Sequence, residues 1–278
     1  MMLSACASDG GVVSAAMPFL KCQDKTTPPK LSDEIVGGQT VGYADPDQKV
    51  VVLLKIHHAG HDSICTGSLI RDRVILTAAH CVSGVEASDV SAFFVTEEGC
   101  PIDRQQLVVR TGKEIAIEKG FDGSPQSYSD VALIKIQQDA PKDQQRLKLV
   151  KAADEFTDEL TLLGYGITDE VRKDAETLRR VYKPKSEISI REKIVVIDQR
   201  KGTGFCRGDS GAPLLASVWT EPKILAVNSA TVGTATNNEC HTLSVAMNVR
   251  YFDNWIETTA DQMSYRSWFR KIADAVGL

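Results

Sequence analysis

Residues 206 to 213 read Cys206-Arg207-Gly208-Asp209-Ser210-Gly211-Ala212-Pro213, and this stretch carries the most informative pattern in the chain. A serine hydroxyl is a weak nucleophile until a neighbouring base takes its proton. The glycines on either side let the backbone approach a bound molecule and turn its N–H groups toward one point. A Gly-Asp-Ser-Gly sequence is also common in ordinary turns. The stretch therefore indicates a reactive Ser210 only if a base and a carboxylate occur elsewhere in the chain.

A candidate base is His80, in the motif Thr77-Ala78-Ala79-His80-Cys81. This motif follows the apolar run Val74–Thr77, so a short turn after a strand would present the imidazole ring at a cleft. Cys65 precedes Cys81 by sixteen residues. A disulfide between them would clamp the loop that positions His80. A lone histidine is more often structural, and the neighbouring cysteines are what favour a functional role here.

A candidate carboxylate is Asp130, which directly precedes the apolar strand Val131–Ile136. A buried carboxylate there would fix the tautomer of His80 and stabilise the imidazolium that forms in a reaction. Asp122 and Asp139 offer the same chemistry, but neither directly precedes an apolar strand. Taken alone, Asp130 is more often a solvated turn residue. Its assignment therefore depends on the two motifs above.

Short apolar runs recur from Ile35 onward, and many are separated by clusters of Gly, Asp, Asn and Pro. Many short strands with turn signals predict an all-β sandwich or barrel. Helical spacing occurs only near the end, in Tyr251–Thr258 and Ser264–Val276. The charged segment Gln137–Glu159 is the best candidate for a connection between two halves. The apolar runs are Val50–Ile56, Val74–Thr77, Val131–Ile136, Leu160–Leu163, Ile194–Ile197, Leu214–Trp219, Ile224–Val227 and Leu243–Val249.

The composition narrows the class of protein. The chain has 278 residues, enough for one large β-domain or two modest ones. Apolar residues make up 42% and charged residues 25%, which is typical of a globular protein. The net charge of −5 argues against a nucleic-acid-binding protein. The longest unbroken apolar run, Val50–Leu54, is far too short to span a bilayer.

The histidine, aspartate and serine motifs, in that order, resemble those of the trypsin/chymotrypsin family of serine endopeptidases. Gly164-Tyr165-Gly166 resembles the family's Gly-Trp-Gly turn, with tyrosine in place of tryptophan. Ala226-Val227-Asn228-Ser229 resembles the strand that lines the family's substrate groove, although the usual Ser-Trp-Gly sequence is not kept. The similarity extends from about Ile35 to about Thr258.

The resemblance implies a fold of two antiparallel six-stranded β-barrels with a C-terminal helix, and a cleft between the barrels. We expect a leader at residues 1–34, a protease domain at residues 35–258 and a helical extension at residues 259–278. The first barrel then covers about residues 35–145 and the second about residues 146–250.

The resemblance also implies the chemistry. Ser210 attacks a peptide carbonyl, His80 carries the proton to the leaving amine, and Asp130 orients His80. The N–H groups of Gly208 and Ser210 stabilise the oxyanion. The substrate is a protein or peptide. No metal or organic cofactor is expected, because the histidines have no acidic or Cys partners at zinc-like spacing. The remaining histidine cluster is placed on the turn after Val50–Ile56: His57, His58 and His61.

Ile35-Val36-Gly37-Gly38 resembles the mature N-terminus of these enzymes, which are made as zymogens. Cleavage of the Glu34–Ile35 bond would free an α-amino group that folds inward and pairs with Asp209. A buried Asp209 without a counter-charge is costly, so the new terminus would select the ordered oxyanion loop. Most relatives have Arg or Lys before the Ile. Glu34 therefore implies an activating protease that accepts Glu, or another route to activity, and the alternative is a Gly-rich turn that is not processed.

In the family, the residue six positions before the catalytic serine lies at the floor of the primary pocket, and here it is Gly204. A preference for Arg or Lys needs a carboxylate there. The pocket is therefore expected to be uncharged and to favour apolar or small side chains. Phe205, Ser229 and Ser244 are assigned to the pocket as well. Arg207 either favours acidic groups at the rim or is a solvated surface residue.

The seven cysteines include two further pairs and one remainder. The resemblance pairs Cys206 with Cys240, beside the pocket. Cys22 and Cys100 are then left, and a bridge between them would keep the leader attached after cleavage. This second pairing is by elimination only, since connectivity cannot be deduced from sequence.

Leu3-Ser4-Ala5-Cys6 looks like the lipobox of bacterial lipoproteins, but it lacks the charged and apolar regions that precede such a motif. Cys6 is therefore either lipidated or a free cysteine in the leader. Lipid on Cys6 would leave six cysteines, an even number that suits an oxidising compartment. We expect a monomeric, extracytoplasmic and bacterial protein (secreted, periplasmic or cell-surface) that touches a membrane only through lipid on Cys6.

Two alternatives stay open. A non-catalytic binding protein on the same scaffold is the rival function, because the groove pattern is lost at Ser229–Thr231 and because Glu34 is unusual. The end of the chain either packs as a helix on the body or docks to a partner or membrane surface. Its apolar stripe consists of Trp268, Phe269, Ile272 and Val276.

Overall fold

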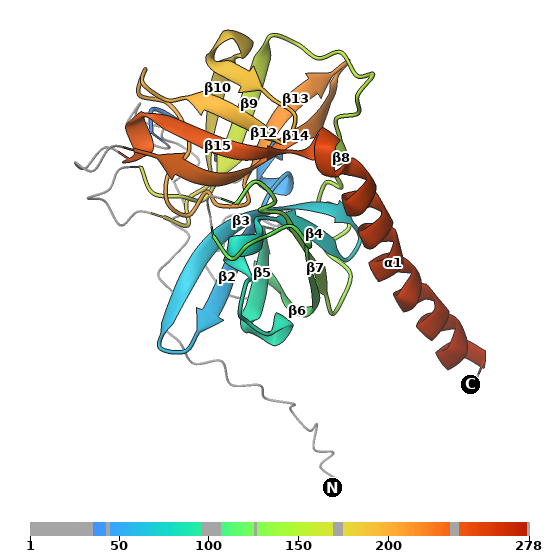
Figure 1. The fold of residues 1–278 in the computed structure, drawn as a ribbon. Coiled ribbons are helices and arrows are strands. Elements are labelled where there is room, and N and C mark those ends of the chain that lie inside the picture. Colours follow the sequence, from blue (N-terminus) through green and yellow to red (C-terminus); the bar gives the residue numbers. More distant parts are fainter. Residues whose placement is uncertain are drawn as a thin grey trace, which may run out of the picture.

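The computed structural model of the chain describes residues 36–42, 45–95, 107–124, 127–168, 175–233 and 239–276, with side chains of the last helix as far as residue 264. Figure 1 shows two β-structures, one above the other, with a long helix that leaves the upper one and runs down beside the lower one. The all-β fold with a C-terminal helix is confirmed.

The first β-structure is a closed antiparallel barrel with the strand order β2-β3-β4-β7-β6-β5. Apolar residues alternate along its strands, as the period of two in a strand requires. Val52, Leu54 and Ile56 point into the barrel, while Leu53 points toward the other β-structure. The strands are β2 (Val52–His58), β3 (His61–Arg71), β4 (Val74–Thr77), β5 (Val90–Val95), β6 (Leu107–Ile117) and β7 (Ala132–Ile136).

The second β-structure is a curled sheet with the order β1-β10-β9-β13-β14-β15-β12-β11. The short strand β8 pairs with β14 in parallel, and the other pairs are antiparallel. The described part of this sheet has nine strands, more than the six expected, because three short strands extend it. The strands are β1 (Gln39–Thr40), β8 (Lys148–Leu149), β9 (Glu159–Gly164), β10 (Arg179–Pro184), β11 (Ile188–Ile190), β12 (Ile194–Asp198), β13 (Pro213–Val218), β14 (Glu221–Val232) and β15 (Leu243–Asn248).

The remaining elements are short 3-10 helices and one long α-helix. The 3-10 helices are η1 (Pro46–Lys49), η2 (Ala79–Cys81), η3 (Ala87–Asp89), η5 (Lys185–Glu187) and η6 (Glu239–His241). The α-helix α1 (Val249–Val276) joins the two helical segments expected from the sequence into one element.

Helix α1 fastens the two β-structures together. Its buried face contributes Phe252, Ile256, Ala260 and Met263 to an apolar cluster shared by both. From the first barrel, Arg71 donates to Glu257 at 2.5 Å and to Asp261 at 3.0 Å, and the buried Lys135 donates to Met263 O. The apolar stripe of Trp268, Phe269, Ile272 and Val276 falls outside the side chains described. Among the described helices, none is long and apolar enough to cross a membrane.

Candidate active site

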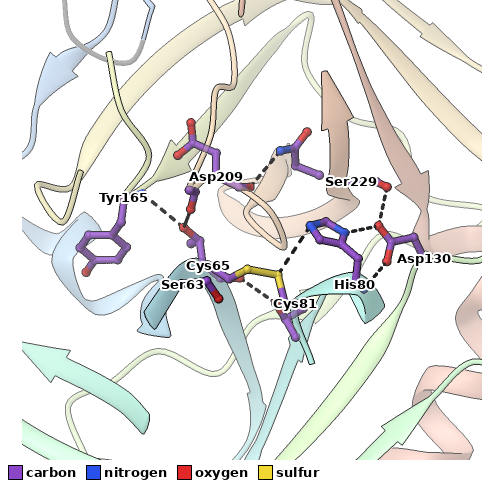
Figure 2. The surroundings of a disulfide bond; sticks show 12 residues. Ser63, Cys65, His80, Cys81, Asp130, Tyr165, Asp209 and Ser229 are labelled. Carbon is purple, nitrogen blue, oxygen red and sulfur yellow. Dashed lines mark hydrogen bonds and ion pairs between the residues drawn. A yellow bond between two sulfur atoms is a disulfide. The ribbon is translucent and has the colours of Figure 1, made fainter. Parts of the chain in front are cut away.

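The pairing of two neighbouring strands brings His80 and Asp130 together. β4 ends at Thr77, which lies opposite Ala132 at the start of β7. The turns next to these strand ends carry His80, in η2, and Asp130 to the same place. Asp130 Oδ2 lies 2.7 Å from His80 Nδ1, and Oδ1 accepts the backbone N–H of His80 at 2.8 Å (Figure 2). The carboxylate therefore fixes both the ring and the backbone of His80.

Asp130 is fully buried and has a third donor in Ser229. Ser229 Oγ donates to Asp130 Oδ2 at 2.5 Å. Ser229 lies at a β-bulge of β14, between Asn228 and Ala230, and such bulges redirect a side chain from its regular position. The sequence placed Ser229 in a pocket wall. In the structure its hydroxyl is committed to Asp130, where it helps to compensate the burial of a carboxylate.

A disulfide holds the turn that carries His80. Cys65 in β3 is bonded to Cys81, with an S–S length of 2.01 Å and a Cα–Cα distance of 6.3 Å. The pairing expected from the sequence is confirmed. Cys81 Sγ also lies 4.0 Å from His80 Nε2, and the side chain of His80 keeps 21% of its surface exposed. One edge of the ring is thus covered while part of it still faces solvent.

Ser210 is fixed against the same part of the first barrel. Thr66, next to Cys65, donates its backbone N–H to Ser210 O at 2.8 Å. Gly211 has a φ of +80°, and a Cβ there would lie 2.0 Å from Thr77 Oγ1, so only glycine allows this approach. In the part of the chain that the structure describes, no hydrogen bond joins Ser210 Oγ to His80. Catalytic hydrogen bonds are often long before substrate binds.

The carboxylate of Asp209 shapes the loop that carries Ser210. Its two oxygens accept the backbone N–H groups of Gly166 at 2.8 Å and Cys206 at 2.9 Å. A Cβ on Gly166 would lie 2.5 Å from the Asp209 carboxyl carbon, which explains why the Gly164-Tyr165-Gly166 turn needs glycine there. Asn228 Nδ2 donates to Asp209 O at 2.9 Å. The loop is thereby held from both sides.

The residues expected to line the primary pocket are all buried. Phe205 and Ser244 expose 0% of their surface, and Gly204 is buried as well. The Phe205 ring packs in the core of the second sheet. Cys206 and Cys240 form a disulfide with an S–S length of 1.97 Å, as expected. Four further residues of the sequence-based assignment lie outside the described part: Cys6, Cys22, Ile35 and Cys100.

The family model described as Trypsin matches residues 35–256. The chain belongs to the trypsin family. The assignment to a trypsin-type serine endopeptidase, made from the three motifs, is thus confirmed at the level of the family, and bacterial origin stays a prediction.

Two trypsin-family relatives show how distant the similarity is. Trypsin zeta of Drosophila erecta is 26% identical over 146 residues, which are 51% of this chain and 50% of that protein. Trypsin zeta of Drosophila melanogaster is 24% identical over 225 residues, which are 73% of this chain and 79% of that protein. The first alignment therefore spans only half the length of the relative.

Asp209, for which the sequence predicts a pairing with a new N-terminus, has an unusual charge environment. Burial raises the pKa of Asp209 to about 6, against the lowering effect of the Cys206 and Gly166 N–H groups and of Arg179. Arg179 is buried at the start of β10, and its Nη1 donates to Gly166 O at 2.7 Å. Arg179 was not predicted from the sequence, since no motif marks a cation that binds a backbone carbonyl.

Three of the four histidines outside the trypsin-family motifs lie at the β2–β3 hairpin, and the fourth, His241, lies in η6. His57 and His58 end β2 and His61 begins β3, so they belong to strands and not only to the turn that was expected. His57 Nδ1 lies 2.7 Å from Asp62 Oδ1, and the rings of His58 and His61 stack. Cys65, His80 and Cys81 lie close enough to suggest a metal site, but their sulfurs are consumed by the disulfide.

Proposed function

We propose that this protein is a serine endopeptidase that hydrolyses peptide bonds through an acyl-enzyme. The observation that carries the proposal is the contact between the buried Asp130 carboxylate and His80 Nδ1, next to the segment that anchors Ser210. A histidine held by a buried carboxylate keeps the tautomer whose Nε2 can accept a proton.

The proposed steps are those known for the trypsin family. Ser210 Oγ attacks the carbonyl carbon of the substrate while His80 Nε2 takes its proton. The N–H groups of Gly208 and Ser210 stabilise the oxyanion, and Gly208, with a φ of +94°, has the backbone conformation that such a turn requires. His80 then gives its proton to the leaving amine. A water molecule, deprotonated by His80, hydrolyses the acyl-enzyme and restores Ser210.

We further propose that cleavage of the Glu34–Ile35 bond activates the chain. Gly204 N donates to Val36 O at 3.1 Å, so the segment after the proposed cleavage point already contacts the expected pocket floor. The raised pKa of Asp209 supports the same idea, because a new ammonium group beside it would relieve the cost of its burial. Residues 1–34 would then be a leader, retained through a Cys22–Cys100 bridge.

The two disulfides support an oxidising compartment outside the cytoplasm. Lipid on Cys6 and a monomeric state belong to the same proposal. The rival function, a binding protein on the same scaffold, is favoured by the burial of the expected pocket residues and makes a different prediction for catalysis.

Hydrolysis of peptides separates the two functions. The chain is expressed with a protease site engineered before Ile35, cut, and incubated with a mixed peptide library whose products are read by mass spectrometry. We expect new cleavage products from the cut chain, and a loss of about a millionfold in kcat for the Ser210→Ala variant. A cut chain whose product rate equals that of Ser210→Ala would support the binding protein.

A further inference from the structure

The side chain of Gln199, which precedes Gly204 in the same loop, fills the floor of the expected pocket. Gln199 follows β12 and exposes 0% of its surface. A Cβ on Gly204 would lie 2.2 to 2.4 Å from the Gln199 side-chain atoms Cδ, Oε1 and Cγ. The space above the Gly204 backbone is therefore filled by the amide of Gln199.

Hydrogen bonds to the backbone of Phe205 and Cys240 fix the side chain of Gln199 in this position. Its Oε1 accepts the Phe205 N–H at 2.7 Å, and its Nε2 donates to Phe205 O at 3.0 Å and to Cys240 O at 2.9 Å. Phe205 precedes one cysteine of the Cys206–Cys240 disulfide, and Cys240 is the other. Both donor hydrogens of the amide are thus used by the protein itself.

A buried ammonium group holds the loop that carries Gln199. Lys183 in β10 exposes 0% of its surface, and its Nζ donates to Asp198 O at 2.6 Å and to Thr203 O at 3.1 Å. Glu187 Oε2 lies 2.5 Å from the same nitrogen. Asp198 directly precedes Gln199, and Thr203 directly precedes Gly204. Lys183 therefore binds the loop at both of its ends. These contacts fix the backbone of the loop, and the Gln199 side chain can leave its position only by breaking its own three hydrogen bonds.

We propose that Gln199 is a specificity-determining residue that restricts the residue before the scissile bond to small, uncharged side chains such as Gly, Ala and Ser. The inference rests on the proposed peptidase function and names its substrate class. A large side chain would have to displace an amide that makes three hydrogen bonds. An Arg or Lys side chain would meet no carboxylate at this floor, and burial of an uncompensated charge is costly.

The test compares peptides that differ only in the residue before the scissile bond: Ala, Ser, Phe and Arg. The cut enzyme is first titrated with a fluorophosphonate probe to give the concentration of reactive Ser210. We expect kcat/KM for the Ala and Ser peptides to exceed that for the Phe and Arg peptides by about 100-fold. Labelled enzyme that cleaves the Phe or Arg peptide as fast as the Ala peptide would overturn the inference and leave the proposed function intact. Absence of labelling would overturn both.

Two variants test the role of Gln199 itself. Gln199→Ala removes the amide that fills the pocket floor. The ratio of kcat/KM for the Phe peptide to that for the Ala peptide should then rise by about 10-fold or more, and most of the change should lie in KM for the Phe peptide. The matched control is Gln144→Ala, because Gln144 is also a buried glutamine that donates to backbone carbonyls, but it lies in another region, bonded to Lys49 and Val51. The control should leave the ratio unchanged. An equal ratio in Gln199→Ala and in the parent would refute the assignment of Gln199. If Gln199→Ala does not fold, the selectivity of the parent among the four peptides still tests the inference.

Discussion

The buried carboxylate of Asp209 makes the stability of the uncut chain depend on pH in a defined direction. Burial raises the pKa of Asp209 to about 6 from its usual 3.8, and a difference of one in pKa corresponds to about 1.4 kcal/mol. At pH 7 the ionised carboxylate therefore costs the fold about 3 kcal/mol. Because the pKa is raised on folding, the stabilising contribution of this group is complete below pH 3.8 and is lost as the pH rises through 6.

The perturbation that isolates this effect is Asp209→Asn, because asparagine does not titrate. Both proteins carry Ser210→Ala, which prevents self-digestion, and the Glu34–Ile35 bond is intact. Free energies of unfolding are measured in urea at pH 7, 6 and 5. On going from pH 7 to pH 5, we expect the protein that retains Asp209 to gain about 1 kcal/mol relative to the Asp209→Asn variant. Other carboxylates change both proteins equally and cancel in the comparison.

Cleavage before Ile35 supplies an independent version of the same experiment. If the new ammonium group pairs with Asp209, the pKa of that carboxyl falls back toward its usual 3.8, and the cost of ionising it in the folded chain disappears. The cut chain should then be more stable than the uncut chain by about 3 kcal/mol at pH 7, and the advantage should shrink toward pH 5. A difference between the parent and Asp209→Asn that is constant over this range, or that falls on acidification, would refute the reasoning.

Two further predictions concern the supports of the site. Replacing both Cys65 and Cys81 with Ala removes a cross-link between residues sixteen apart. The free energy of unfolding, measured in urea titrations, should fall by about 3 kcal/mol. An unchanged free energy of unfolding would show that the disulfide contributes little. Gly166→Ala places a Cβ 2.5 Å from the Asp209 carboxyl carbon. Labelling of the cut chain by a fluorophosphonate should slow by about 10-fold or more, while the circular dichroism spectrum stays the same. A labelling rate equal to that of the parent would contradict the proposed link between Asp209 and the oxyanion loop.

Much of the candidate active site was predictable because its residues lie beside strands with clear patterns. The apolar runs that end at Thr77 and begin at Val131 identify two strands, and their pairing carries His80 and Asp130 together. The Cys65–Cys81 bridge was predictable for a related reason, because one cysteine lies next to the predicted base. In these cases each residue lies directly beside a strand or a cysteine that the sequence marks.

The supports that act on backbone groups were not predictable. Gln199 and Arg179 bind backbone groups of other residues, and a backbone group has no signature in the sequence. The bond from Ser229 to Asp130 was not expected either, because it depends on a β-bulge that the sequence does not mark. The burial of Gly204 follows from Gln199 and could not be seen from the position of Gly204 alone.

The central claim is that His80 activates Ser210 as a nucleophile. The most direct measurement is the covalent labelling of the cut chain by a fluorophosphonate, followed by peptide mass spectrometry to locate the adduct, in the parent and in His80→Ala. We predict a single adduct on Ser210 in the parent, and a labelling rate at least about a thousandfold lower in His80→Ala. A cut chain that acquires no adduct, an adduct on another residue, or equal labelling of the two proteins would contradict the claim.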